Sequence, residues 1–196
     1  MQKLIQLQAP DYLICAVHLS YDAAKNERQK FKKVVELLER CSRKFSIPLI
    51  FLSTAAVFND ARIAIKEDQL PTAVSEYGCF YAELEELIIK KQRKHIILRS
   101  PWWFSGVGEN FLTAVVNYAA EDLLISLNSA AKSSPTAAQD IARVVVAILL
   151  QLEAGAENWG VYHYSSADAA LGFQFMEAIV AQASQYDSNI NAKQLK

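Results

Sequence analysis

Cysteine and histidine, the side chains most often used as nucleophiles and metal ligands, are few and scattered in this 196-residue sequence. The chain has three of each: Cys15, Cys41 and Cys79, and His18, His95 and His163. Neither set has the close spacing of a zinc site or of a disulfide framework, so no metal is expected. No nucleophile–base pair stands out either. Widely spaced cysteines in odd number are typical of a reducing compartment, which predicts a cytoplasmic location.

Two hydroxyl side chains stand at the boundaries of expected elements. Thr54 directly follows an apolar stretch that predicts a strand, and Tyr77 begins a stretch that predicts a helix. A tyrosine works as a general acid when its pKa is brought from about 10 toward the working pH. Each residue also has a structural interpretation, Thr54 as a turn hydroxyl and Tyr77 as a packing residue. The residues alone leave both interpretations open.

The elements that would position these residues alternate between apolar runs and helical periodicity. We expect strands at Tyr12 to Val17, Leu49 to Ser53, His95 to Arg99 and Val161 to Tyr164, with a weaker candidate at Leu124 to Ile125. We expect helices at Asp22 to Lys44, Tyr77 to Arg93, Glu109 to Ala120, Thr136 to Leu152 and Leu171 to Gln185, after a short helix at Gln2 to Gln8. Nearly continuous apolar strands between helices predict an α/β fold with a parallel sheet and helices on both faces.

Composition excludes several classes of protein. Hydrophobic residues make up 52% of the chain and the net charge is −1, which gives no overall electrostatic attraction to nucleic acid. The basic cluster from Lys25 to Arg43 alternates with Glu36 and Glu39 and is interpreted as a solvated helix face. The longest apolar runs, such as Val144 to Leu150, are too short to span a bilayer. We therefore expect neither a nucleic-acid partner nor a membrane partner.

Glycine is scarce where dinucleotide binding would need it. None of the six glycines forms a Gly-x-Gly-x-x-Gly turn between a strand and a helix. Gly106 and Gly108 follow a strand, but no third glycine comes after them. The backbone N–H groups that hold a pyrophosphate at a helix N-terminus are thus not predicted from these residues.

Seven different short motifs lie along the chain, at Pro10 to Ile14, Leu52 to Asn59, Glu76 to Tyr81, Ile97 to Gly106, Asn110-Phe111, Pro135-Thr136 and Gly160 to His163. In order and approximate spacing they resemble the motifs of the dTDP-4-dehydrorhamnose reductases, a sugar-nucleotide-binding group of extended short-chain dehydrogenases/reductases. Together they cover nearly the whole chain. The resemblance implies a Rossmann-like sheet that lacks the first three strands of the family fold.

The resemblance also suggests how the chain is organised. We expect one α/β domain over residues 1–196, in which about 1–120 form the second half of a Rossmann-like core. Residues from about 121 to 187 would be a remnant of the substrate-binding region, and 188–196 a polar tail.

Departures from the family pattern concern the reaction itself. The family reductases pass a hydride from a nicotinamide cofactor to a keto sugar while a tyrosine donates a proton. The resemblance places Thr54 and Tyr77 at the hydroxyl and proton-donor positions, and puts Tyr81 where the family has the lysine that lowers the tyrosine pKa. Ala55 and Ala56 replace an Asp-Tyr pair, and Phe31 falls on a helix asparagine. A phenol supplies no cation, so the resemblance implies a vestigial catalytic site.

Substrate contacts are implied at Asn110, Trp102 and Thr136, although Trp102 belongs to an aromatic cluster that is more typical of packing. The sequence therefore predicts a degenerate, non-catalytic relative with a scaffold, sugar-nucleotide-binding or assembly role, and no cofactor in this chain. The alternative is an NAD(P)-dependent sugar-nucleotide reductase or epimerase seen without its N-terminal cofactor-binding segment.

One strand bears on assembly. In the family's sheet order the strand at residues 12–17 loses a neighbour, and it has no proline or charge within Leu13 to Val17 to protect an edge. We expect a second copy of the chain, or a partner chain with the short N-terminal helix, to cover this edge.

Overall fold

The computed structural model describes residues 1–59, 65–121 and 132–190. The weak strand candidate at 124–125 lies outside these residues. Contacts within the chain divide it into two compact units. Unit 1 comprises Met1–Ser100 and Ala156–Tyr164, and unit 2 comprises Pro101–Gly155 and Ser165–Lys196. The boundary expected near residue 120, between the Rossmann-like core and the remnant of the substrate-binding region, stays a prediction.

Unit 1 is built on a four-stranded parallel sheet with the order β1-β2-β3-β7. Its strands are β1 (Leu13–Cys15), β2 (Leu49–Thr54), β3 (His95–Ser100) and β7 (Gly160–His163). Every residue of β2 and β3 is buried, as expected of central parallel strands. Among the described residues β1 pairs only with β2, so it forms an edge. The sheet confirms the parallel α/β fold that the apolar runs predicted.

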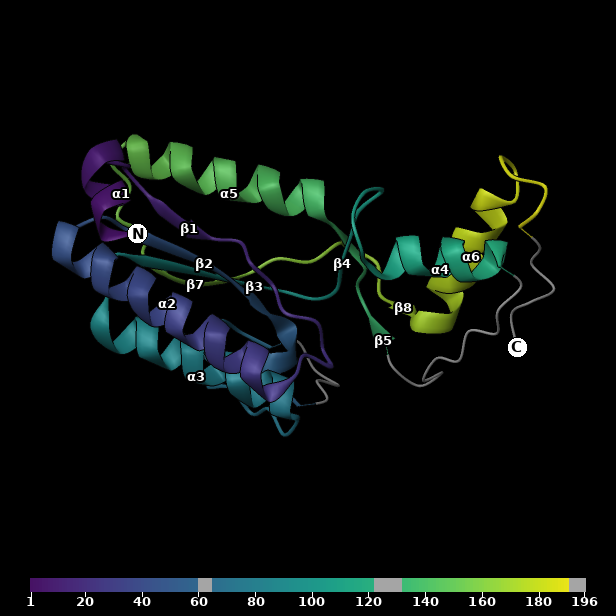
Figure 1. The fold of residues 1–196 in the computed structure, drawn as a ribbon, viewed down its shortest axis with the longest axis horizontal. Coiled ribbons are helices and arrows are strands. Elements are labelled where there is room, and N and C mark those ends of the chain that lie inside the picture. The colour runs from purple at the N-terminus through teal and green to yellow at the C-terminus, as the bar shows by residue number, and fades with distance from the viewer. Residues whose placement is uncertain (60–64, 122–131, 191–196) are drawn as a thin grey trace. The chain divides into compact units, whose positions relative to one another are not determined.

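The α-helices of unit 1 in its described residues are α1 (Gln2–Gln8), α2 (Lys25–Phe45) and α3 (Glu76–Lys91). Helices α2 and α3 lie side by side over one face of the sheet (Figure 1). The buried stripe of α2 includes Phe31 and Val35, and its lysines point outward, which is the amphipathic pattern seen in the sequence. Ion pairs Arg28–Glu76 and Lys32–Glu83 join the two helices along their exposed side.

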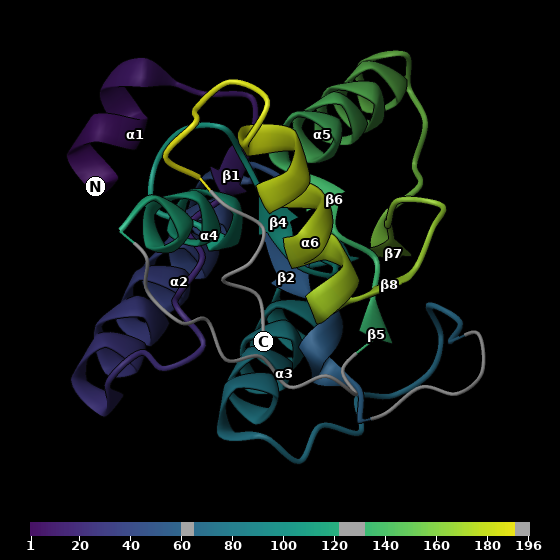
Figure 2. The same ribbon diagram turned by 90° about the vertical axis from the view of Figure 1, so that its right-hand side faces the viewer.

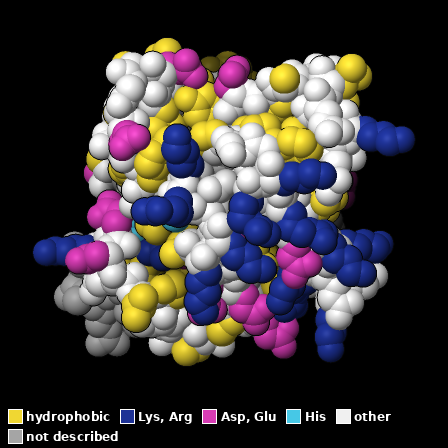
Figure 3. All heavy atoms as spheres, turned by 90° about the vertical axis from the view of Figure 1, so that its left-hand side faces the viewer, with side chains coloured by type: hydrophobic (Ala, Val, Ile, Leu, Met, Phe, Trp, Pro, Cys, Tyr) yellow, Lys and Arg dark blue, Asp and Glu magenta, His cyan; other side chains and the backbone are white. Residues whose placement is uncertain are grey.

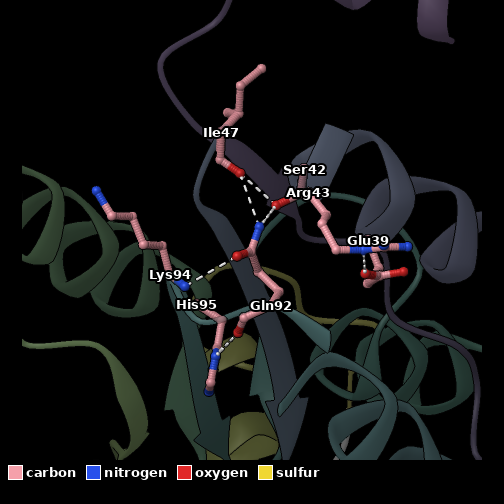
Figure 4. A network of polar contacts seen from close by, with 7 residues as sticks. All are labelled: Glu39, Ser42, Arg43, Ile47, Gln92, Lys94 and His95. Atoms are coloured by element: carbon pink, nitrogen blue, oxygen red, sulfur yellow. Dashed lines mark hydrogen bonds and ion pairs between the residues drawn. The ribbon is translucent and has the colours of Figure 1, made fainter. Parts of the chain in front are cut away.

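A buried polar network closes the unit where α2 and α3 end and β3 begins (Figure 4). The Gln92 amide donates to the Ser42 hydroxyl, which donates to the Ile47 carbonyl. The Gln92 side-chain oxygen accepts from the Lys94 backbone N–H at 3.1 Å, and the Gln92 carbonyl contacts Nδ1 of His95. Buried polar groups at the helix ends thereby find partners instead of remaining unsatisfied.

Unit 2 contains three helices and two short strand pairs among its described residues. These elements are β4 (Trp103–Phe104), α4 (Phe111–Ala120), β5 (Lys132–Ser133), β6 (Thr136–Ala137), α5 (Ala138–Glu153), β8 (Ala170–Leu171) and α6 (Gly172–Ala183). Helices α4 and α6 pack against each other (Figure 2), with Val115 and Met176 in their shared core. Strand β4 is parallel to β6, and β5 is antiparallel to β8.

Candidate functional site

The catalytic residues expected from the sequence meet at the carboxyl edge of the unit 1 sheet. Thr54 ends β2, and Tyr77 lies in the first turn of α3, which follows β2 in the chain. In open parallel sheets, ligands bind outside the carboxyl ends of the strands. The segment that follows β1 reaches the same edge and contributes His18.

A close backbone approach sets the distance between the two predicted residues. Thr54 caps the short 3-10 helix η1 (Ala55–Val57), and its hydroxyl accepts a hydrogen bond from the Ala56 backbone N–H at 3.1 Å. The start of α3 packs so tightly on η1 that a Cβ on Gly78 would lie 2.0 Å from the Ala56 carbonyl oxygen. Glycine is therefore required at this position, and it brings Tyr77 next to Thr54.

Tyr77 is held as a neutral phenol. Its hydroxyl lies 2.9 Å from Nδ1 of His18, and its side chain is largely buried. Burial raises the pKa of Tyr77 far above its usual value, and the neighbouring Tyr81 raises it further. A hydrogen bond with the Thr54 side chain has a smaller, opposing effect on that pKa. Burial also lowers the pKa of His18, so the imidazole is neutral and its Nδ1 can accept a hydrogen bond from the Tyr77 hydroxyl.

Tyr81 occupies the position where the resemblance expects a lysine. Its side chain is fully buried, and its hydroxyl accepts a hydrogen bond from the Leu19 backbone N–H at 3.1 Å. Its ring stacks on His18 with centroids 5.0 Å apart and packs against Phe31 and Phe51. Phe31, expected at the place of a family asparagine, is thus part of an aromatic core around Tyr81.

A buried ion pair joins α3 to β3. The Arg99 guanidinium binds Glu85 through its Nε and Nη2 atoms, at 3.1 and 2.8 Å from the nearest carboxylate oxygens, and the two side chains are 3% and 1% exposed. The Ser53 hydroxyl donates to the same carboxylate. Arg99 also contacts Nε2 of His163 at 3.3 Å and lies over the ring of Phe58. These contacts fix the carboxyl ends of β2, β3 and β7 to the middle of α3.

Unit 1 also has a surface cavity of about 740 Å³, but Thr54 and Tyr77 do not line it. Its walls come from α3, from residues 67–71 and from the sheet, and they include Glu67, Glu83, Val161 and the ion-paired side chains of Glu85 and Arg99. The cavity is therefore distinct from the tyrosine site.

The predicted substrate contacts belong to unit 2, which is described by itself. Asn110 caps α4, accepts from the Leu112 backbone N–H at 3.0 Å, and donates to the carbonyls of its own loop, including Ser105 at 2.9 Å. Thr136 is fully buried, and its hydroxyl donates to the Ser134 carbonyl at 2.9 Å. Trp102 is partly exposed and packs on Phe111 with ring centroids 5.6 Å apart. Substrate binding by these three residues stays a prediction.

Sequence reasoning missed the role of His18 in the site. His18 and Tyr77 are 59 positions apart, so no local spacing joins them. The available signal was topological, because His18 lies just beyond a predicted strand and residues after parallel strands meet at one edge of the sheet. No group of three or more potential metal ligands is found in the part of the chain that the structure describes.

Comparison with known proteins identifies relatives along the whole chain. A family model described as the RmlD substrate binding domain matches residues 1–196. The dTDP-4-dehydrorhamnose reductase of Sinorhizobium fredii is 27% identical over 196 residues, which are 96% of this chain and 65% of that protein. The chain thus spans about two thirds of the length of this relative.

Solved structures agree in fold. The dTDP-4-dehydrorhamnose reductase from Clostridium acetobutylicum matches with a TM-score of 0.83 at 20% identity, covering all of this chain and 68% of that one. The enzyme from Bacillus anthracis, solved in complex with NADP, matches with a TM-score of 0.79 at 24% identity, covering 93% of this chain and 66% of that one. These matches support the Rossmann-like fold and the expectation that part of the family fold lies outside this chain.

Proposed function

Because this chain belongs to the family of RmlD substrate-binding domains, we propose that it is a degenerate reductase relative that binds a nucleotide sugar as a scaffold module and does not reduce it. The cytoplasmic location expected from its cysteines is part of the same proposal.

The observation that carries this proposal is the environment of Tyr81. A lysine at this position would place an ammonium near the Tyr77 phenol and favour the phenolate. Tyr81 instead supplies an aromatic ring that stacks on His18, and its hydroxyl is bonded to the Leu19 N–H. Burial therefore acts on the pKa of Tyr77 without a compensating cation, and the pKa moves away from neutrality. General acid–base catalysis near pH 7 requires the opposite shift.

A nicotinamide cofactor does not fit the residues present at this site. In the family a lysine would hold the nicotinamide ribose. This chain has Tyr81 at that position, and the Tyr81 hydroxyl is already hydrogen-bonded to the Leu19 backbone N–H. The ring of Tyr21 also lies against Tyr77, with centroids 5.1 Å apart. The Tyr81 hydroxyl and the Tyr77 ring thus have partners within the chain, which supports the expectation that this chain binds no NAD(P).

Two measurements on the purified chain test the proposal. Isothermal titration calorimetry should detect binding of a dTDP-sugar, and it should show no saturable micromolar binding of NADPH. Incubation with NADPH and a dTDP-4-keto sugar should give no loss of absorbance from the reduced nicotinamide. Turnover that disappears in Tyr77→Phe would refute the non-catalytic assignment, and absence of dTDP-sugar binding would refute the binding role.

A substitution at the lysine position adds a control. Tyr81→Lys should not create activity, because the cofactor contacts are still missing. It should also lower stability, since the new ammonium would be surrounded by Phe31, Phe51 and Tyr77.

The alternative function, a reductase or epimerase whose cofactor-binding segment is not part of this chain, is favoured by the retained Thr54–Tyr77 pair and by the greater length of the relatives. Addition of a separately expressed N-terminal half of a relative distinguishes the two functions. NADPH consumption restored by that addition would support the alternative.

A further inference from the structure

One end of unit 1 carries a concentration of cations that the sequence does not reveal. Helices α2 and α3 both terminate there, at the end of the sheet opposite to the tyrosine site (Figure 1). Figure 3 shows Lys and Arg side chains gathered over this face, with a smaller number of Asp and Glu side chains among them. We call this surface the basic end, and its exposed residues are Arg40, Arg43, Lys44, Lys90, Lys91, Arg93 and Lys94.

Some of these charges are paired with carboxylates. Glu39 is buried and pairs with Arg43, and Glu86 pairs with Lys90. Among the residues that the structure describes, Lys91 and Arg93 have no ion-pair partner. The cluster in the sequence from Lys25 to Arg43, interpreted above as a solvated helix face, is joined at its far end by cations about 50 positions later in the chain. Proximity of the two helix ends therefore makes a patch out of two ordinary charge runs.

The chemistry of the patch selects the kind of anion it can bind. Helix C-termini present carbonyl groups and the negative end of the helix dipole, so no backbone N–H cradle for a single phosphate exists here. The cations instead sit on long side chains that reach outward over an exposed face, which suits an extended anionic surface.

Exposed apolar side chains favour a lipid surface over a nucleic acid as the anionic partner. Helix α1 lies at the same end of unit 1 (Figure 1). Its Ile5 packs into the core, while Leu4 and Leu7 are 59% and 79% exposed. Exposed leucines and exposed cations at the same end of one unit match the boundary between headgroups and acyl chains, whereas leucines offer nothing to a nucleic-acid backbone.

The expectation of no membrane partner rested on the shortness of the apolar runs, which concerns only membrane-spanning segments. We propose, against that expectation, that the basic end is a peripheral docking surface for a bilayer that contains anionic phospholipids. No helix in the described parts of the chain has the length and apolarity to cross a bilayer, and a peripheral contact requires none. The proposal is independent of the assignment of the tyrosine site.

Flotation with lipid vesicles tests this surface on the intact chain. The probes are vesicles of phosphatidylcholine alone and of phosphatidylcholine with about 30% phosphatidylserine, a strongly anionic mixture. The test variant combines Lys91→Gln, Arg93→Gln and Lys94→Gln. The matched control combines Lys25→Gln, Lys30→Gln and Lys33→Gln, which removes the same charge from the N-terminal half of α2. All six side chains are exposed, so both variants should fold, and circular dichroism verifies this.

The wild-type chain should float with the anionic vesicles and not with pure phosphatidylcholine, and about 0.5 M NaCl should release it. Each cation near an anionic surface contributes about 1 kcal/mol, or about five-fold in partitioning, so the test variant should bind about 100-fold more weakly. The control should lose far less. Equal losses in both variants, binding to neutral vesicles, or binding to duplex DNA or poly-glutamate without binding to anionic vesicles would each overturn the proposal.

Discussion

Replacement of Glu85 by glutamine tests the ion pair that anchors the middle of α3 to the sheet. Glu85 receives three hydrogen bonds from the Arg99 guanidinium and one from Ser53, and both charged side chains are almost completely buried. Glutamine preserves the size of the side chain but removes its charge, and it turns an NH₂ group toward donors that need an acceptor.

The structure indicates the size of the effect. Loss of one partner leaves the Arg99 guanidinium buried and uncompensated, which typically costs about 3–5 kcal/mol of folding free energy. The neighbouring residue gives a matched control. Glu86 forms an ion pair with Lys90, but these side chains are 62% and 68% exposed, so Glu86→Gln should cost about 0.5 kcal/mol or less.

Urea denaturation followed by far-ultraviolet circular dichroism measures both variants under the same conditions. A double variant, Glu85→Leu with Arg99→Met, separates the loss of a charge partner from the loss of packing. It should be clearly more stable than the sum of the two single changes predicts, because neither charge is then buried alone. Equal destabilisation by Glu85→Gln and Glu86→Gln, or simple additivity in the double variant, would refute the reasoning.

Three further outcomes are expected. The free energy of unfolding should fall as the pH drops below about 6.5. Burial lowers the pKa of all three histidines in the folded chain, so below that pH the unfolded chain binds more protons than the folded chain. Urea titrations at pH 7.5, 6.5 and 5.5 check this, and a flat profile would contradict it. Gly78→Ala should destabilise by more than about 2 kcal/mol in thermal unfolding, because its Cβ collides with the Ala56 carbonyl, whereas Gly106→Ala, which meets nothing within 4 Å, should be nearly neutral. Light scattering should give about twice the monomer mass, and Ile14→Lys, which changes the edge strand β1, should lower it; a monomer that tolerates this change would leave the edge-covering prediction without support.

Local patterns in the sequence carried most of the fold. The apolar runs at residues 49–53 and 95–99 predicted β2 and β3 within one residue, because parallel central strands are buried on both faces. The helical periodicity of residues 22–44 and 77–93 predicted α2 and α3 almost as closely. Periodicity did not show that unit 1 is completed by β7 only after most of unit 2 has intervened.

The candidate site was predictable in part. The positions of Thr54 and Tyr77 followed from the family motifs, and the structure brings them together. The partners that decide their chemistry, His18 for Tyr77 and Leu19 for Tyr81, come from the segment after β1, about 60 positions away in the sequence. Such contacts depend on tertiary packing, which a propensity or a spacing does not encode. Glu85 and Arg99 likewise read as ordinary charges until the fold buries them.

The divided course of unit 1 has a consequence for synthesis on the ribosome. Synthesis of β3 is complete once Ser100 has been added, but its parallel neighbour β7 ends only at His163, after a long stretch of unit 2. At about 5–20 residues per second, the roughly sixty intervening residues take on the order of 3 to 13 s to emerge. During that interval the nascent chain displays β3 with one side unpaired, and chaperones that recognise apolar strand edges would act on it at this stage of translation.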